Sequence, residues 1–223
     1  MSFSGSNLKN IFQNIQHYSP QPLNVRVVAV TKGFSHEAIL SALSHNITNI
    51  GENRVQEFLN KKLNIKNKKF EAHLIGHLQS NKIKKAVQIF NIIETVDSIA
   101  ISEKINKHMQ RLNKTQRIYI QINIGSDPKK YGFSTKNIFQ KIEKIEKMKH
   151  LKIEGIMTIL PYTKQASDSE KYFAQMRKIS QNIIHKVSPT CLNLSMGMSR
   201  DYIYALKQGA THIRVGTLLY GTR

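Results

Sequence analysis

Several features are scarce or absent in this sequence of 223 residues. The single cysteine, Cys191, excludes a framework of internal disulfides and suits a reducing compartment. No apolar run approaches the roughly 20 residues that a transmembrane helix needs. The first residues also lack the basic start and apolar stretch of a secretory signal. We therefore expect a soluble, cytoplasmic protein without a membrane segment.

The motifs of several common catalytic and binding sites are also missing. The chain has no G-x-G-x-x-G and no G-x-x-x-x-G-K-[ST], which weakens the case for a nucleotide-binding fold. The nine histidines form no H-E-x-x-H, and Ser195 lacks the G-x-S-x-G context of a hydrolase. We expect neither a metal site nor a serine hydrolase. Because no linker rich in proline and glycine interrupts the chain, we assign one domain to residues 1–223.

Acidic residues are few, 14 against 34 lysines and arginines, which gives a formal charge of +20. Such a charge can indicate a nucleic-acid partner, and we keep that function as an alternative. The lysines, however, are spread along the whole chain. The densest run, "NKKLNIKNKKF" at 60–70, has no interleaved aromatics for base stacking, and we interpret it as a solvated helix end and loop. We expect no specific nucleic acid, although the positive field favours anionic ligands such as phosphate esters.

What the chain does contain is an alternation of short β-rich runs with longer amphipathic segments. A helical pattern follows each of the first seven runs, and another, "NLKNIFQNIQHY", precedes the first. Eight units of this kind favour a closed (β/α)8 TIM barrel with an extra N-terminal helix. An open, doubly wound sheet is the alternative. The candidate strands lie at 25–30, 47–52, 71–76, 91–96, 117–123, 153–159, 190–197 and 212–221.

A lysine stands at the tip of the first apolar run, "VRVVAVTK". Active-site groups of a barrel lie at the C-terminal ends of its strands. There, the amine of Lys32 is desolvated and close to other cations, and both effects lower its pKa from the free value of about 10.4. A neutral lysine amine attacks aldehydes to form a Schiff base. A lysine that snorkels at a strand end is equally common, and the spacing alone does not separate the two.

The seventh and eighth runs end in "SMGMSRDY" and "RVGT". Ser199 is predicted to cap a helix, Gly216 allows close approach of the backbone to an anion, and Thr217 adds a hydroxyl. In barrels, the loops after these two strands often form a phosphate site. Ordinary turn chemistry explains either motif alone, but the pair favours a phosphate. A small molecule with an aldehyde at one end and a phosphate at the other is pyridoxal phosphate.

The same segments resemble a known family. "AVTK", "GENRVQE", "HLIGHLQSNK", "GIMTI", "LSMGMSRDY" and "IRVGT" stand in an order and spacing, over 25–223, similar to those of pyridoxal phosphate homeostasis proteins. The resemblance implies a barrel like the N-terminal domain of alanine racemase, the type III fold of pyridoxal phosphate proteins. It further implies that pyridoxal 5'-phosphate is the cofactor and that Lys32 holds it as an internal aldimine.

The resemblance also implies the other contacts to the cofactor. Arg214 matches a residue near the pyridine nitrogen. Because a guanidinium cannot accept a proton, it would keep that nitrogen unprotonated and weaken the ring as an electron sink. Asn53 and His73 match residues that line the pocket near the ring. The residues that match the phosphate-gripping region are Ser195, Ser199, Gly216 and Thr217.

Members of this family are regarded as carriers or regulators of pyridoxal phosphate, and no established turnover comes with them. Apoenzymes that use the cofactor are therefore the expected partners, and we expect no enzymatic activity. The rival function is amino-acid racemase. Racemases of this fold use a tyrosine as the second base, with the help of an additional C-terminal β-domain. No such segment follows the eighth run here. No coiled coil or large apolar stripe demands a dimer, so we expect a monomer.

Overall fold

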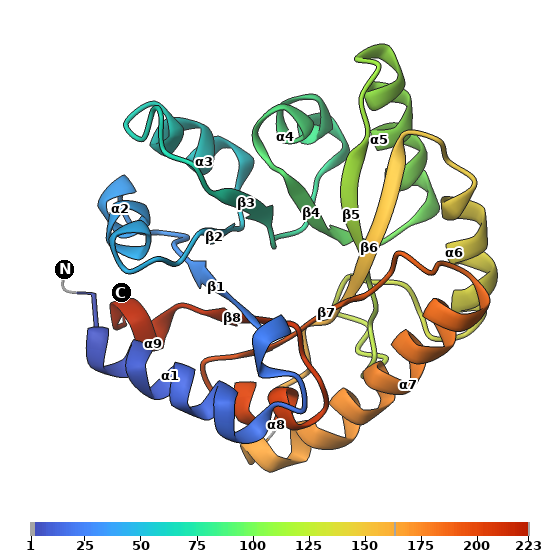
Figure 1. The fold of residues 1–223 in the computed structure, drawn as a ribbon. Coiled ribbons are helices and arrows are strands. Elements are labelled where there is room, and N and C mark those ends of the chain that lie inside the picture. Colours follow the sequence, from blue (N-terminus) through green and yellow to red (C-terminus); the bar gives the residue numbers. More distant parts are fainter. Residues whose placement is uncertain (1–2, 163, 223) are drawn as a thin grey trace.

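The computed structural model describes residues 3–162 and 164–222. Within this part of the chain, eight parallel strands form a closed barrel in sequential order (Figure 1). The ring closes where the first strand pairs with the last, with Arg26 opposite His212 and Ala29 opposite Val215. The predicted (β/α)8 barrel is confirmed, and the open sheet is excluded. The strands are β1 (Arg26–Val30), β2 (Asn49–Glu52), β3 (Glu71–Leu74), β4 (Ile92–Val96), β5 (Gln116–Gln121), β6 (Leu151–Met157), β7 (Asn193–Met198) and β8 (His212–Val215).

Helices surround the barrel on its outside (Figure 1). The predicted N-terminal helix is present as α1, and it packs against the last two helices of the chain. Short 3-10 turns span Pro22–Asn24, Ser80–Lys82 and Ala166–Ser169. The helices are α1 (Gly5–Tyr18), α2 (His36–Ser44), α3 (Val55–Lys62), α4 (Ile83–Ile89), α5 (Ile99–Arg111), α6 (Ile138–Glu146), α7 (Glu170–Lys186), α8 (Tyr202–Lys207) and α9 (Thr217–Tyr220).

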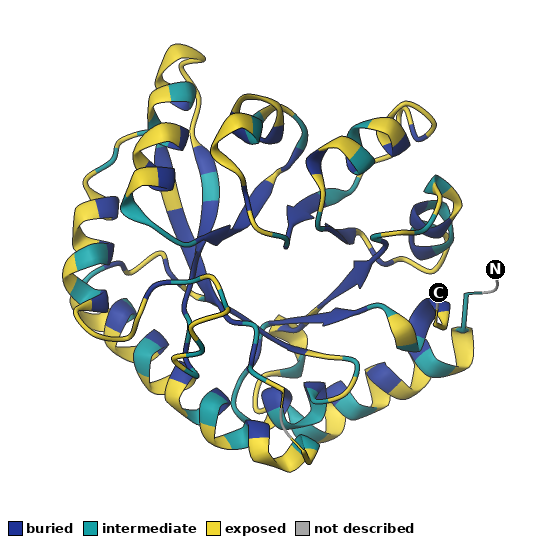
Figure 2. Cartoon of the chain, turned by 180° about the vertical axis from the view of Figure 1, so that it is seen from behind, coloured by how far each residue is buried: buried dark blue, intermediate teal, exposed yellow. Residues whose placement is uncertain are grey.

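The apolar core lies between the barrel and its helices. In α6, Ile138, Ile142 and Ile145 recur at helical spacing and are buried, so they form the stripe that faces the strands. Figure 2 shows this division, with most of the strands dark and the outward faces of the helices largely yellow. Cys191 is buried in this core, as expected of a structural cysteine. In the described part of the chain, no helix is long and apolar enough to cross a membrane.

Three predictions about local structure are wrong. The run 212–221, predicted as one strand, ends at Val215, because α9 turns back to bury Leu219 and to let the Tyr220 hydroxyl donate to the Ala38 carbonyl. Ser199 does not cap α8, since the N-cap is Asp201, whose carboxylate accepts the Met198 N–H.

The third error concerns the lysine-rich run at 60–70. Its other lysines are exposed, as expected of a solvated helix end, but Lys61 is only 6% exposed. The side chain turns inward because two carboxylates, Glu52 and Glu57, lie within 2.7 Å of its Nζ. A lysine with two such partners is stable in a buried position that a solvated lysine would not adopt.

Candidate functional site

A cavity of about 530 Å³ lies among the C-terminal ends of β1, β7 and β8 and the loops that follow them. Its volume falls in the usual range for small-ligand sites. Apolar walls come from Val30, Phe34, Ile75 and Ile159, among others. A small set of polar groups converges on the same space, and apolar walls with few polar groups are typical of a ligand site. These polar residues are Lys32, Asn53, Ser199, Arg200, Arg214, Thr217 and Thr222.

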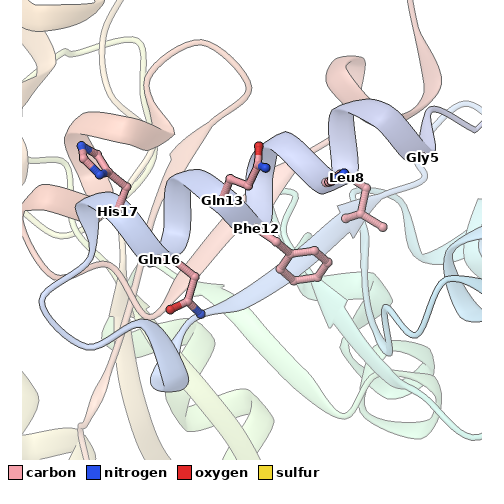
Figure 3. A pocket seen from close by; sticks show the side chains of 7 residues that line it. Gly5, Leu8, Phe12, Gln13, Gln16 and His17 are labelled. Atoms are coloured by element: carbon pink, nitrogen blue, oxygen red, sulfur yellow. The ribbon is translucent and has the colours of Figure 1, made fainter.

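A second, larger hollow of about 720 Å³ runs along α1 (Figure 3). All of its lining residues come from this one helix, and they include the exposed Phe12. Its ionisable side chains are those of Lys9 and His17. Since no second element contributes a polar group, the hollow offers no converging set of ligands, and we place the candidate site at the strand ends.

Lys32 lies in a tight turn directly after β1. The N–H of Phe34 donates to the Thr31 carbonyl over 3.2 Å, which closes the turn around Lys32 and Gly33. Gly33 has a φ of +73°, in the left-handed region that a type II turn requires at this position. The glycine therefore allows the chain to turn sharply at the rim, and the lysine side chain lines the cavity.

The loops after β7 and β8 meet at the same cavity. The N–H of Gly216 donates to the Ser199 hydroxyl over 3.4 Å and so joins the loops. A Cβ at position 216 would lie 3.3 Å from the Val30 carbonyl oxygen, so glycine permits β8 to end close against β1. The structure thus brings Lys32 together with Ser199, Gly216 and Thr217, although they are far apart in the sequence.

Arg214 lies at the inner end of the cavity and is only 4% exposed. Its Nη1 donates to the Ser195 hydroxyl over 2.7 Å, and its Nη2 donates to the Thr158 carbonyl over 2.6 Å. The Ser195 hydroxyl in turn donates to Glu94 Oε2 over 2.6 Å. The other Glu94 oxygen is 2.6 Å from His73 Nδ1. A buried polar chain therefore runs from the cavity into the barrel interior.

The surroundings of Glu94 and Arg214 in this series of hydrogen bonds shift the pKa of each group. Burial would raise the pKa of Glu94, but the hydrogen bond from His73 and the positive charges of His73 and Arg214 outweigh it and lower the pKa to about 2. Burial lowers the pKa of Arg214 from its very high ordinary value, and Glu94 and Asp201 oppose that change. A guanidinium stays protonated in proteins, so Arg214 offers only hydrogen-bond donors to the cavity.

Of the remaining predicted residues, one lines the cavity and two are buried in the barrel interior. Asn53 lines the cavity, and its Oδ1 is buried without a hydrogen-bond partner among the described residues. His73 and Ser195 are fully buried below Arg214 and do not line the cavity. Sequence reasoning missed Glu94 and Thr158. Glu94 had a signal, because it is a charged residue in the middle of the apolar run "NIIETV". Thr158 acts through its backbone carbonyl, for which the sequence gives no signal.

The barrel and its strand-end cavity place the chain in a known class. Residues 5–223 match the family model of the alanine racemase N-terminal domain. Alanine racemase of Clostridium difficile has a TM-score of 0.78 at 16% identity, over 100% of this chain and 58% of that chain, which shows the fold alone.

Closer relatives narrow the assignment. The pyridoxal phosphate homeostasis protein of Synechocystis sp. is 38% identical over 91% of this chain and 93% of its own length. PipY of Synechococcus elongatus, whose structure was solved with pyridoxal phosphate bound, has a TM-score of 0.82 at 31% identity, over 95% of this chain and 100% of that chain. The chain belongs to the pyridoxal phosphate homeostasis protein family, as the sequence motifs predict.

Proposed function

We propose that the protein binds pyridoxal 5'-phosphate as a Schiff base with Lys32 and acts in the homeostasis of this cofactor as a carrier or regulator. One observation carries the proposal. Lys32 from the β1 end and the Ser199–Gly216 contact from the β7 and β8 loops line one cavity of about 530 Å³. An amine and a cluster of small hydrogen-bonding groups are what an aldehyde and a phosphate on one ligand require. The pyridoxal phosphate bound to PipY supports the same ligand class.

The lining residues fit the two ends of this ligand. Bound pyridoxal phosphate supplies an aldehyde that captures amines reversibly. The Lys32 amine adds to the aldehyde carbon, a C=N bond forms, and the carbonyl oxygen leaves as water. The hydroxyls of Ser199 and Thr217 and the backbone of Gly216 are assigned to the phosphate. Arg214 is assigned to the pyridine nitrogen, and Asn53, with its unpartnered Oδ1, to a donor on the ring.

His73 and Ser195 belong to the site in a supporting role. Ser195 contacts Arg214 directly, and His73 is linked to it through Glu94 and Ser195. We propose that they fix the guanidinium and do not themselves touch the cofactor.

The electrostatics of the proposed site would make the cofactor ring a weak electron sink. Because Arg214 is a donor that cannot accept a proton, the pyridine nitrogen opposite it stays unprotonated, and the ring withdraws electrons weakly. We also propose that the protein is a monomer of the cytoplasm and passes the cofactor to apoenzymes without binding a specific nucleic acid. A reducing compartment is supported by the single cysteine, Cys191.

The test of this function is the absorption spectrum of the protein with pyridoxal phosphate. We expect a band at about 420 nm from the lysine Schiff base, and Lys32→Ala should abolish it. Lys129→Ala, which removes an exposed lysine of the loop after β5, serves as the matched control and should keep the band. Borohydride reduction followed by peptide mass spectrometry should place the label on Lys32. A band of unchanged amplitude in Lys32→Ala would show that another amine binds the cofactor.

The same preparation tests the racemase alternative. With L-alanine in D₂O, a carrier should show no rapid exchange of the Cα hydrogen and no loss of optical activity. Rapid exchange with racemisation would establish an enzyme in place of a carrier.

A further inference from the structure

A second buried group of charges lies beside the turn that bears Lys32. The Nζ of Lys61, in α3, donates to Glu52 Oε1 over 2.6 Å and to Glu57 Oε1 over 2.7 Å. Lys61 is 6% exposed and Glu52 is fully buried, while the Glu57 side chain is 25% exposed. We call these three residues the Lys61 cluster.

The cluster holds the residues on both sides of Lys32. The Lys61 Nζ donates to the Thr31 carbonyl over 2.8 Å, and the Thr31 hydroxyl donates to Glu52 Oε1 over 2.6 Å. On the other side, the N–H of Gly33 donates to Glu57 Oε1. The turn around Lys32 is therefore fixed at its first residue by a carbonyl and a hydroxyl, and at its third residue by an amide.

A buried group of charges is not an efficient way to raise the free energy of unfolding. Burying Lys61 and Glu52 has a large desolvation cost, and apolar residues of similar size often stabilise a protein as well or better. One oxygen of the cluster, Glu52 Oε2, is buried, and no group in the described part of the chain forms a hydrogen bond with it. The charged side chains provide directed hydrogen bonds to the backbone on either side of Lys32, and apolar side chains cannot provide them.

We propose that Lys61, Glu52 and Glu57 are positioning residues, which hold the turn at Thr31 and Gly33 so that the Lys32 amine meets the aldehyde of the bound cofactor. This inference rests on the proposed function, because it assumes that Lys32 forms the Schiff base. A turn held in the bonding geometry loses little conformational freedom when the C=N bond forms. Loosening the turn should therefore weaken the covalent bond and leave the noncovalent contacts of the ligand unchanged.

Two ligands separate these effects. Pyridoxal 5'-phosphate can form the Schiff base, whereas pyridoxine 5'-phosphate carries an alcohol in place of the aldehyde and cannot. Glu57→Ala removes the acceptor for the Gly33 N–H at a partly exposed position, where the variant is expected to fold. We expect it to raise the dissociation constant of pyridoxal phosphate about tenfold, which corresponds to the loss of one charge-assisted hydrogen bond. The affinity for pyridoxine phosphate should stay within about twofold of wild type by the same reasoning.

Further variants sharpen the test. Lys61→Met removes the charge but keeps the length of the chain, and it should act like Glu57→Ala or more strongly. Glu57→Gln keeps an oxygen that can accept the Gly33 N–H, and should restore much of the binding of pyridoxal phosphate. The matched control is Lys144→Met, which breaks the exposed ion pair with Glu103, 3.3 Å apart, and should change neither ligand. If Lys61→Met does not fold, the comparison of Glu57→Ala with Glu57→Gln still tests whether the cluster positions Lys32.

Each other outcome overturns the inference. Equal weakening of both ligands by Glu57→Ala would mean that the cluster shapes the cavity in general and does not position Lys32. Unchanged binding of both would mean that the turn keeps its geometry without the cluster. The absence of a Lys32 Schiff base in the wild-type protein is a separate result, read from the 420 nm band, that removes the proposed function itself and this inference with it.

Discussion

At the scale of single residues, the site depends on how Arg214 is held. Its guanidinium is buried, and its hydrogen bonds go to the Ser195 hydroxyl and the Thr158 carbonyl. Ser195 also donates to Glu94, so one hydroxyl links a buried cation to a buried anion. A serine that lies below the cavity in this way acts on a ligand through Arg214, whereas Ser199 lines the cavity.

This difference predicts that one serine variant mainly lowers stability, whereas the other mainly weakens cofactor binding. Ser195→Ala leaves buried donor and acceptor groups unsatisfied, so we expect the free energy of unfolding to fall by about 1–3 kcal/mol. Ser199→Ala, at a half-buried position, should change it by less than about 0.5 kcal/mol but should weaken cofactor binding. Urea unfolding and titration with pyridoxal phosphate measure the two quantities. A stable Ser195→Ala that loses phosphate binding would instead place this hydroxyl on the phosphate.

The sequence predicted the outer part of the site better than its support. Lys32, Ser199 and Gly216 follow apolar strands, where barrel topology directs active-site groups, so their position could be inferred from order alone. Glu94 and the contact of Lys61 with Glu52 could not be assigned in this way, because the partners come from other strands. A charged residue in an apolar run shows that a partner exists but does not identify it.

At the scale of elements, the cavity depends on close contact between the ends of neighbouring strands. Gly76 follows β3 and approaches the segment after β2 so closely that a Cβ there would lie 2.2 Å from the Asn53 carbonyl oxygen. That atom belongs to the backbone, so it cannot move aside as a flexible side chain can. Asn53 lines the cavity, and a shift of its backbone would therefore change the shape of the site.

We accordingly expect Gly76→Ala to weaken cofactor binding and to lower stability by about 1–3 kcal/mol, the usual range for overpacking. Binding is measured from the 420 nm band and stability by urea unfolding. The control is Gly5→Ala in α1, where the new Cβ would be 3.9 Å from the nearest side-chain atom and should be tolerated. Wild-type binding by Gly76→Ala would show that the two strand ends can separate without harm to the site.

The elements themselves were largely predictable, because apolar alternation and helical spacing are local properties of the chain. All eight predicted strands exist, with ends that differ from the predicted ones by a few residues. The largest error, at 217–220, arose because "TLLY" is as apolar as a strand. As a helix, it places the Tyr220 hydroxyl where it donates to the Ala38 carbonyl, a tertiary contact that the local pattern does not indicate.

At the scale of the whole molecule, the barrel interior links stability to pH. His212 of β8 is 6% exposed, and burial together with the charge of His73 lowers its pKa from 6.5 to about 3. Below pH 6.5 the unfolded chain binds a proton at this histidine while the folded protein does not. The stabilisation is therefore fully present above pH 6.5 and is lost as the pH falls from 6.5 toward 3.

The expected slope is about 1.4 kcal/mol of unfolding free energy per pH unit within that window. Urea unfolding at several pH values should show this loss in the wild type and a smaller one in His212→Gln. The difference between the two curves isolates the histidine, because Glu52, whose raised pKa acts in the opposite direction, titrates in both proteins. Equal slopes would show that the His212 ring is protonated in the folded state at mildly acidic pH.

The pairing of β1 with β8 has a consequence for the order of events when the protein forms. Lys32 lies next to the first strand and Gly216 next to the last, so the groups proposed to bind the aldehyde and the phosphate become neighbours only when the ring closes. A nascent chain that has not yet exposed β8 from the ribosome lacks half of the site. Capture of the ligand is therefore coupled to ring closure, and free cofactor should act as a pharmacological chaperone that favours the closed barrel by mass action.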